Sequence, residues 1–206
     1  MLFRSYLNVL AAKAGKIRSN GITGTVEITS GVTDLGSLFG KIGTATVNVD
    51  ANGMTGALST VASNIGKVTS IRNLSIDAGR MAAEIAALLG KDLAGDAVVT
   101  VDGMDAARLN AVADAIAGVK ADDGVRGALA LTSEVTEDAT AGLRMGALFG
   151  KLKSDAVVTA ACSGMSTGQL TKLATKSGQI ATDGLTGTFT LTSAVDRKST
   201  RLNSSH

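Results

Sequence analysis

The chain has very few of the side chains that usually fill a protein core of this size. Only 2% of its 206 residues are aromatic, and it contains neither proline nor tryptophan. Cores of ordinary globular domains use Phe, Tyr and Trp as large space-filling residues. Here small aliphatic residues and 25 glycines take their place. Such residues suit thin layers in which each turn of the chain packs on the next.

Cysteine is almost absent as well. The single Cys162 excludes an internal disulfide framework and a cysteine-rich metal site. It occupies the position that Ala51 has in an earlier copy of the same segment, so we interpret it as a small buried residue. No apolar run approaches the roughly 20 residues of a membrane span, and no signal peptide is visible at the N-terminus. We therefore expect no membrane insertion.

Histidine occurs only once, as His206, in a polar tail that begins after Val195. The tail, residues 196–206, reads DRKSTRLNSSH, which matches one translated frame of a common sequencing adapter. We interpret it as a non-native, disordered tail and exclude it from fold reasoning. Removal of residues 196–206 is expected to leave the melting temperature unchanged, and a clear loss on thermal unfolding would contradict this interpretation.

The tail also carries the excess positive charge of the chain. It contains one acidic and three basic side chains: Asp196, Arg197, Lys198 and Arg201. Without them the formal net charge falls from +2 to zero, so the sequence pI of about 8.8 indicates no nucleic-acid partner. Without the tail the chain has no histidine. It therefore lacks the commonest general base, and Ser/His/Asp and Cys/His catalytic sets are excluded. We predict that the chain is not an enzyme and holds no metal or cofactor.

Internal repetition dominates the remaining sequence. A segment with an Asn/Asp-Gly turn, alternating apolar residues and Thr-Ser recurs, with one shorter relative, at residues 20–30, 123–133, 183–193 and 71–77. A second segment that ends in Gly-Met alternates with it, at residues 45–54, 97–104 and 156–165. Successive Gly-Met pairs are about 50 to 60 residues apart, which is typical of repeat proteins.

Each period reads as strand, helix, strand, helix. The strand cores contain alternating apolar pairs: Val26/Ile28, Val47/Val49, Leu74/Ile76, Leu129/Leu131 and Phe189/Leu191. The intervening segments have apolar residues at helical spacing, such as Leu58, Val61 and Ile65. We predict an α/β fold, a leucine-rich-repeat-like solenoid with a parallel sheet on one side, short helices on the other and right-handed crossovers.

The repeats predict a single array over residues 1–195. It would hold about 3.5 repeats, over residues 1–54, 55–104, 105–165 and a partial 166–195. Residues 7–24 align with residues 170–187, so the chain begins inside a repeat helix without an atypical cap. We therefore expect both ends to be cuts in a longer reading frame.

Signals for helix ends recur with the repeats. Asp34 and Asp105 are predicted N-caps, and Ser166 with Gln169 forms a capping-box pattern. Three glycines that follow a Leu-Phe or Leu-Leu pair and precede lysine are predicted to adopt the left-handed C-cap conformation: Gly40, Gly90 and Gly150.

Two glycine-rich segments, residues 36–41 and 146–151, superficially resemble a phosphate-binding loop. That loop requires four residues between its glycines and Ser or Thr after its lysine. Here the spacing is three, and Ile42 or Leu152 follows the lysine. We therefore do not assign nucleotide binding.

Three acidic residues follow predicted strands and raise the question of calcium: Asp50, Asp77 and Asp102. The nonapeptide of calcium-binding β-rolls is absent, and the third copy has Ala161 in place of Asp50. We interpret these aspartates as turn caps.

The outward face of the strands is the remaining candidate surface. Its residues are small or polar: Glu27, Asn48, Ser75, Thr100, Ala130, Thr159 and Thr190. A flat, weakly polar face of this kind could bind a protein, a polysaccharide or, more remotely, ice. The simpler interpretation, which we favour, is the solvated side of a half-buried sheet.

Residues 50–54, 123–133 and 164–170 resemble the repeats of very large bacterial surface and secreted proteins. In those repeats short Thr/Ala/Gly-rich strands alternate with short Ala/Leu helices, and the resemblance extends over residues 1–195. It implies an extracellular or cell-surface location, reached without a cleaved N-terminal signal.

Three functions are compatible with this sequence. The first is a non-enzymatic structural or adhesive segment of a large extracellular repeat protein. The second is a ligand-binding module that uses the exposed sheet face for a glycan or a protein. The third is an intracellular protein-interaction scaffold. An enzyme would need a non-repeating insertion with clustered polar residues, and we expect none.

Overall fold

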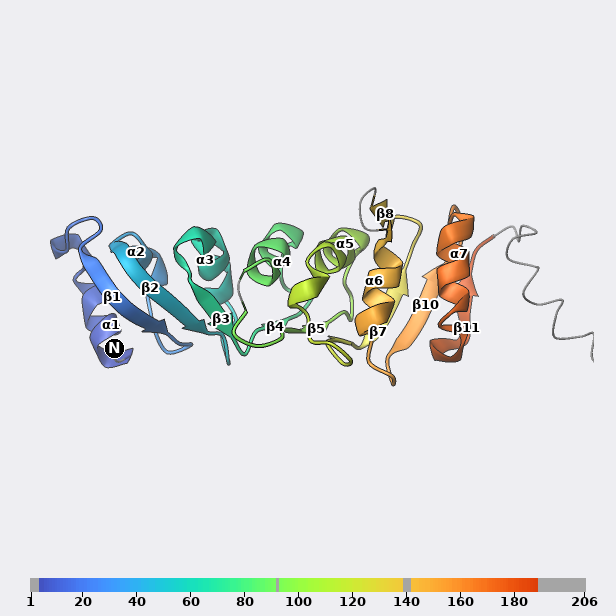
Figure 1. The fold of residues 1–206 in the computed structure, drawn as a ribbon, viewed down its shortest axis with the longest axis horizontal. Helices are drawn as coiled ribbons and strands as arrows, with labels where there is room; N and C mark the ends of the chain where they lie inside the picture. The colour runs from blue at the N-terminus through green and yellow to red at the C-terminus, as the bar shows by residue number, and fades with distance from the viewer. Residues whose placement is uncertain (1–3, 92, 139–141, 189–206) are drawn as a thin grey trace, which may run out of the picture.

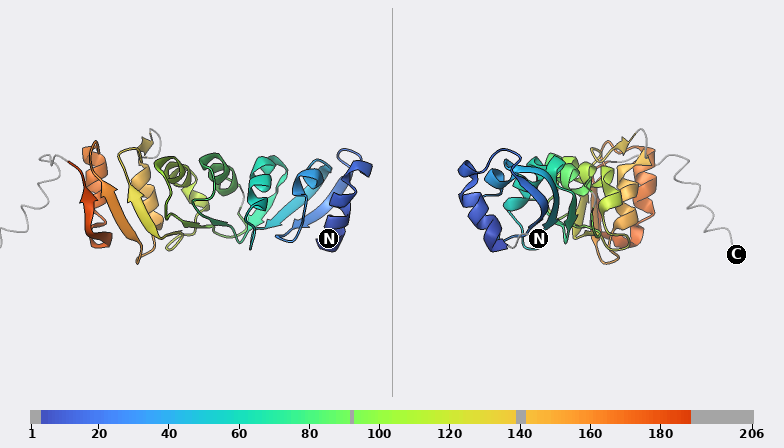
Figure 2. Two further views of the ribbon diagram at one scale, coloured as in Figure 1. Left: turned by 180° about the vertical axis from the view of Figure 1, so that it is seen from behind. Right: turned by 60° about the vertical axis from the view of Figure 1, so that its left-hand side comes forward.

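The computed structural model describes residues 4–91, 93–138 and 142–188. Within these ranges the chain is a mixed α/β protein with three small parallel sheets and seven α-helices, and it contains no closed barrel. The elements follow one another along an elongated molecule, with α1 and β1 at one end and α7 and β11 at the other (Figure 1). The views from behind and from the side show the same single row of elements (Figure 2).

The first sheet is formed by residues from the N-terminal third of the chain. Its three strands are β1 (Ile22–Ile28), β2 (Ile42–Asp50) and β3 (Ser70–Arg72). The helices around them are α1 (Arg4–Ala12), α2 (Leu35–Phe39) and α3 (Ala57–Ser63), with the 3₁₀ helices η1 (Ala14–Lys16) and η2 (Ile65–Lys67). A helix therefore precedes each strand, and all strand pairs are parallel.

The second and third sheets are also parallel, but the first strand of each follows the last strand of the preceding sheet without an intervening helix. The second contains β4 (Ser75–Ile76), β5 (Val98–Thr100) and β6 (Val125–Arg126), with α4 (Ala82–Leu89), α5 (Ala106–Asp114) and η3 (Ile116–Gly118). The third contains β7 (Ala128–Leu131), β10 (Val157–Ala161) and β11 (Ile180–Thr186), with α6 (Arg144–Lys151), α7 (Thr167–Ala174) and η4 (Ser177–Gln179). Consecutive helices contact one another from α1 to α7.

Residues with positive φ divide the expected single sheet into three. Asn73 (φ 56°) lies between β3 and β4, and Gly127 (φ 93°) separates β6 from β7. A left-handed residue changes the direction of the strand. As a result, β3 pairs with β2, whereas β4 pairs with β5. Isolated parallel bridges, such as the one between Val125 and Leu152, connect neighbouring sheets.

One apolar core extends along the described chain. The predicted strand pairs are buried, each residue being at most 3% exposed: Val26/Ile28, Val47/Val49, Leu74/Ile76 and Leu129/Leu131. The fifth pair, Phe189/Leu191, lies outside the described residues. Cys162 is 1% exposed, which confirms its interpretation as a small core residue.

The predicted helix starts are confirmed. The carboxylates of Asp34 and Asp105 accept hydrogen bonds from the backbone N–H three residues later, at 3.4 and 2.9 Å. Ser166 and Gln169 form the reciprocal capping box, with bonds of 3.2 and 2.8 Å.

The predicted left-handed helix ends are wrong. Gly40 and Gly90 have right-handed conformations, with φ of −60° and −77°, and Gly150 lies inside α6. Position 90 favours glycine for a steric reason, because a Cβ atom there would lie 2.8 Å from the Ala86 carbonyl oxygen. The left-handed glycines lie at strand kinks and at Gly-Met turns: Gly24, Gly53, Gly103, Gly127, Gly164 and Gly187.

One small element was not predicted from the repeats. An antiparallel hairpin of β8 (Glu137–Asp138) and β9 (Gly142–Leu143) interrupts the connection from β7 to α6. Each of its strands has only two residues, which is too short to produce an alternating pattern in the sequence.

Candidate functional site

The candidate residues on the outward strand face lie in three sheets and do not form one continuous row. The strand register pairs them as follows: Glu27 with Asn48, Ser75 with Val98, Thr100 with Arg126, and Ala130 with Thr159. Thr190 lies outside the described residues. Because the paired residues differ from sheet to sheet, the outward surface of each sheet carries different side chains.

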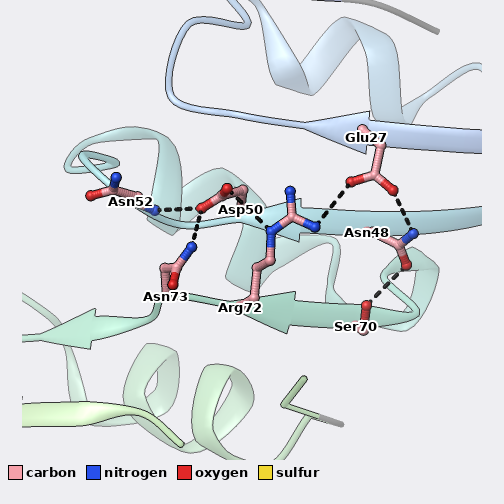
Figure 3. Close-up of polar contacts among 7 residues, drawn as sticks. All are labelled: Glu27, Asn48, Asp50, Asn52, Ser70, Arg72 and Asn73. Carbon is pink, nitrogen blue, oxygen red and sulfur yellow. Dashed lines mark hydrogen bonds and ion pairs between the residues drawn. The ribbon is translucent and has the colours of Figure 1, made fainter. Parts of the chain in front are cut away.

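The first sheet presents a network of polar side chains (Figure 3), called here the first-sheet network: Glu27, Asn48, Asp50, Ser70, Arg72 and Asn73. The side-chain amide of Asn48 donates to Glu27 Oε1 at 2.7 Å and accepts from Ser70 Oγ at 2.9 Å. These three residues are adjacent in the register of β1, β2 and β3. One asparagine thus connects all three strands through side chains.

Arg72 joins the two acidic residues of this network. Its Nε atom lies 3.2 Å from Asp50 Oδ2, and its Nη1 atom lies 3.8 Å from Glu27 Oε2. Glu27 Oε2 is buried and accepts no hydrogen bond within the described residues. The guanidinium group therefore offsets the charge of a carboxylate whose side chain is only 16% exposed.

Hydrogen bonds lower the pKa of Asp50 below its ordinary value. The largest cause is the bond from Asn73 Nδ2 to Asp50 Oδ1, at 2.9 Å. Partial burial opposes this effect, while the backbone N–H of Asn52 at 3.2 Å and the Arg72 guanidinium reinforce it. The carboxylate is thereby held in its ionised form.

The aspartates that we interpreted as turn caps do bind backbone amides. Asp50 and Asp77 each accept from the N–H two residues later, at 3.2 and 2.9 Å. Asp102 differs, because it accepts from the N–H of Ala128, across the kink at Gly127, at 2.9 Å. Among the residues the structure describes, no three His, Cys, Asp or Glu side chains are grouped so that they could hold a metal ion.

A depression of about 560 Å³ lies over the second sheet, and we call it the second-sheet depression. Its lining mixes two bases, one acid, two neutral polar residues and two aliphatic residues: Lys120, Arg126, Asp96, Asn73, Ser75, Leu74 and Val98. Arg126 is held by Asp123, with Nη2 and Oδ2 2.7 Å apart. Lys120 is exposed and makes no ion pair within the described parts of the chain. The depression therefore offers a free cation beside hydroxyl and amide groups.

Ser75 is the only residue lining this depression that was among the candidate site residues predicted from the sequence. The residue that could have indicated this depression is Arg126, because it is a charged residue within an alternating strand and pairs with Thr100. Lys120 and Asp96 could not be placed, because they come from connecting segments before β6 and β5. Their proximity depends on how these connecting segments pack against the second sheet.

In the third sheet the outward residues of β7 and β10 are uncharged. They are small or aliphatic: Ala128, Ala130, Val157, Thr159 and Ala161. Val157 is 45% exposed. Behind this face lies the thiol of Cys162, whose pKa is raised by burial. The thiol is therefore neutral near pH 7 and a poor nucleophile.

Comparison with protein-family models, curated proteins and solved structures finds no match to the chain. No described helix has the length and apolar character needed to cross a lipid bilayer. Any function must therefore be argued from the geometry of the chain itself.

Proposed function

We propose that the chain is an α/β solenoid segment that serves as a non-enzymatic structural or adhesive part of a large extracellular repeat protein. The observation that carries this proposal is a backbone contact made three times. The N–H groups of Ala51, Val101 and Cys162 donate to the carbonyl groups of Arg72, Arg126 and Thr186, at 2.9, 2.8 and 2.7 Å. In every case a strand that leads to a Gly-Met turn is bonded to the residue before a left-handed kink.

Two kinds of helix alternate in support of this proposal. Helices α1, α3, α5 and α7 are each followed by a 3₁₀ turn, whereas α2, α4 and α6 are not. A side-chain contact recurs with the first kind. Asn8 Nδ2 donates to the Gly31 carbonyl at 3.0 Å, and Asn110 Nδ2 donates to the Glu134 carbonyl at 2.9 Å. Both asparagines follow a fully buried leucine, and they bind the turns that follow β1 and β7.

The contacts are local along the chain. The principal contacts between elements join neighbours, such as β1 with β2 and α4 with α5, and none joins the first sheet to the third. Stability in such a protein is a sum over units and their interfaces, so length can change without loss of the fold. That property suits a spacer, which acts through its length and its surface.

Duplication of one period tests the solenoid. Residues 74–127 are inserted again after Gly127, so that the kink residue precedes the new copy as Asn73 precedes the original. We expect a longer maximum dimension in small-angle X-ray scattering, unchanged ellipticity per residue and a melting temperature at least as high. A control inserts the same residues in scrambled order. If the insert in native order also lowered the ellipticity per residue, it would be unfolded, and the repeat architecture would be refuted.

The extracellular assignment needs a separate experiment. Protease added to intact cells of the source organism should cleave the protein. Cleavage only after lysis would contradict a surface location and favour an intracellular scaffold.

Ligand binding is a second candidate function, because the second-sheet depression contains a free cation beside polar groups. We propose a glycan or protein ligand there. A panel of acidic and neutral oligosaccharides, titrated by calorimetry, tests the glycan case. Lys120→Ala should abolish any binding, while Lys41→Ala, which lies at the start of β2, should leave it unchanged. Equal loss in both variants would place the ligand elsewhere.

A further inference from the structure

The three Gly-Met turns of the chain share one backbone geometry. In each, the methionine N–H donates to the carbonyl three residues earlier at 2.9 to 3.0 Å, and the glycine has positive φ: residues 51–54, 101–104 and 162–165. The N–H groups of these glycines donate no hydrogen bond within the described residues. The residue before the glycine differs, being Asn52, Asp102 or Ser163. Differences in the chemistry of the turns therefore depend on this residue.

In the second and third turns a hydrogen bond holds the side chain of that residue. Asp102 Oδ1 accepts from the N–H of Ala128 at 2.9 Å. In the same way, Ser163 Oγ accepts from the N–H of Thr188 at 3.0 Å. Each donor follows a kink glycine, and a Cβ atom at either glycine would collide with the side chain that accepts the bond. The absence of a Cβ atom at the kink therefore makes room for this contact.

The first turn lacks this room. Its kink residue is Asn73, which carries a Cβ atom and whose Nδ2 donates to Asp50 Oδ1 at 2.9 Å. Asn52 is exposed, and its side chain makes no hydrogen bond within the described parts of the chain. Only its backbone N–H binds the first-sheet network, at Asp50, and the side-chain amide extends away from that residue (Figure 3). The amide of Asn52 is therefore free to move beside the unbonded N–H of Gly53.

An asparagine followed by glycine can lose its side-chain amide without an enzyme. The backbone nitrogen of the glycine attacks the side-chain carbonyl carbon, Cγ, and forms a succinimide ring. The side-chain nitrogen leaves as ammonia and takes up the proton of the backbone N–H. Water then opens the ring at one of its two carbonyl carbons, which yields aspartate or an isoaspartyl residue whose main chain runs through Cβ. Glycine favours the attack because it has no side chain to restrict the backbone.

The other Asn-Gly pair of the sequence, Asn20 with Gly21, is held against this reaction. The Gly21 N–H donates to the carbonyl of Arg18 at 3.0 Å, so its nitrogen is engaged. A Cβ atom at Gly21 would lie 2.8 Å from the same oxygen, which shows how closely the backbone packs there. Attack on Asn20 must first break this bond, whereas attack on Asn52 requires no such step.

We propose that Asn52 is a site of spontaneous deamidation in the folded chain, through a succinimide with Gly53. Both products place a carboxylate near that of Asp50, which accepts from the backbone N–H of residue 52 at 3.2 Å. The isoaspartyl product also lengthens the main chain within the turn. The bond from the Ala51 N–H to the Arg72 carbonyl, at 2.9 Å, lies directly before that point. Deamidation therefore weakens the attachment of β2 to β3 and adds negative charge beside the first-sheet network.

Incubation of the full chain near neutral pH, followed by peptide mass spectrometry, tests this proposal. Asn52 should convert about fivefold faster than Asn20, because the Asn20 site must first open a hydrogen bond. The same incubation in urea removes both local structures, and the two rates should then become similar. Three results would refute the proposal: equal rates in the folded chain, faster conversion of Asn20, or conversion of Asn52 in urea alone.

Substitutions at the kink test why Asn52 is free. Asn73→Gly makes this kink like the other two, so the Asn52 side chain gains room to be held, and its deamidation should slow about fivefold. Asn73→Ala is the matched control, because it also removes the bond to Asp50 but keeps a Cβ atom. The rate at Asn52 in this control should stay close to that of the parent chain. Equal rates in the two variants would contradict the proposed cause.

A substitution at the turn itself separates the modification from its effect. Asn52→Ser places the residue of the third turn in the first turn, and serine forms no succinimide. After incubation the parent chain should have a lower melting temperature and additional acidic species in isoelectric focusing, whereas Asn52→Ser should change little in either. Thermal unfolding before incubation verifies that each variant is folded. An unchanged melting temperature in a parent chain modified at Asn52 would overturn the predicted weakening between β2 and β3.

Discussion

In the first sheet the outward strand positions carry Glu27 and Asn48, whereas the same positions of the third sheet carry Ala130 and Thr159. On the inner side the two sheets agree, because Ile28 and Leu131 are both at most 1% exposed. The inward positions are restricted to apolar residues by the packing of strands on helices. Outward positions meet solvent and are free to differ, so the surface chemistry of a sheet is independent of its core.

The two outer faces also contribute differently to stability. In the first sheet, side chains connect three strands, and an ion pair joins Arg72 to Asp50. The third sheet depends on its backbone hydrogen bonds and its core. We therefore expect equal responses to changes in the core and unequal responses to changes on the surface. Four predictions separate these cases.

Truncation of the core should affect both sheets equally and strongly. Ile28→Ala and Leu131→Ala should each lower the free energy of unfolding by about 3 kcal/mol, through lost burial and a residual cavity. Urea unfolding followed by circular dichroism measures both. A cost below about 1 kcal/mol in one sheet would show that its core is loosely packed.

Substitutions at the strand kinks should lower the free energy of unfolding by less than the core truncations, and by different amounts at the two kinks. Gly24 and Gly127 both have positive φ, but a Cβ atom at Gly127 would collide with the Asp102 carboxylate, whereas space is open at Gly24. Gly24→Ala should cost about 1–2 kcal/mol for the left-handed backbone alone. Gly127→Ala should cost about 1 kcal/mol more, because the bond from the Ala128 N–H to Asp102 is also disturbed. Equal losses in urea unfolding would show that Asp102 moves aside freely.

Substitutions on the outward face should change the free energy of unfolding only in the first sheet. Asn48→Ala removes the hydrogen-bond partner of Glu27 Oε1 and of Ser70 Oγ, and we expect a loss of about 1–2 kcal/mol. Thr159→Ala, at the equivalent strand position, should change the free energy of unfolding by less than about 0.5 kcal/mol. A similar small effect in both variants would mean that solvent replaces the first-sheet network without cost.

Acid should weaken the first-sheet network slightly. Because the pKa of Asp50 is lowered in the folded chain, its contribution is present above the unfolded pKa near 4 and is lost as pH falls through the folded pKa. Asp50→Asn should therefore reduce the loss of stability between about pH 5 and pH 3. Asp122→Asn, an exposed acid, is the control. Identical pH profiles for the parent and Asp50→Asn would contradict the role of the Asn73 bond.

The fold was predictable where local signals were strong. Alternating pairs such as Val26/Ile28 identified strands, and side chains such as Asp105 identified helix starts, because each depends on neighbours within a few residues. The ends of helices were less predictable, since Gly90 serves close packing and not a left-handed turn. The division into three sheets was missed because Asn73 interrupts β3 and β4 without an obvious sequence break.

The candidate site was predictable only in part. Glu27 and Asn48 were found from strand alternation, but their partners Arg72 and Ser70 were not. These partners come from a strand about 22 residues further along, and the register of the parallel pair decides that they meet. The second-sheet depression depends on register in the same way, because Lys120 and Asp96 belong to different connections.

The amino-acid sequence alone determined the composition of the core, the alternation of strands with helices and the most frequent helix caps. Each follows from patterns of apolar and polar residues over one or two turns of chain. Only the tertiary structure decided which outward side chains meet, where the sheet divides and which turn leaves its asparagine side chain unbonded. Those properties depend on strand register and on the packing of neighbouring elements, which join residues too distant in sequence for a local pattern to record.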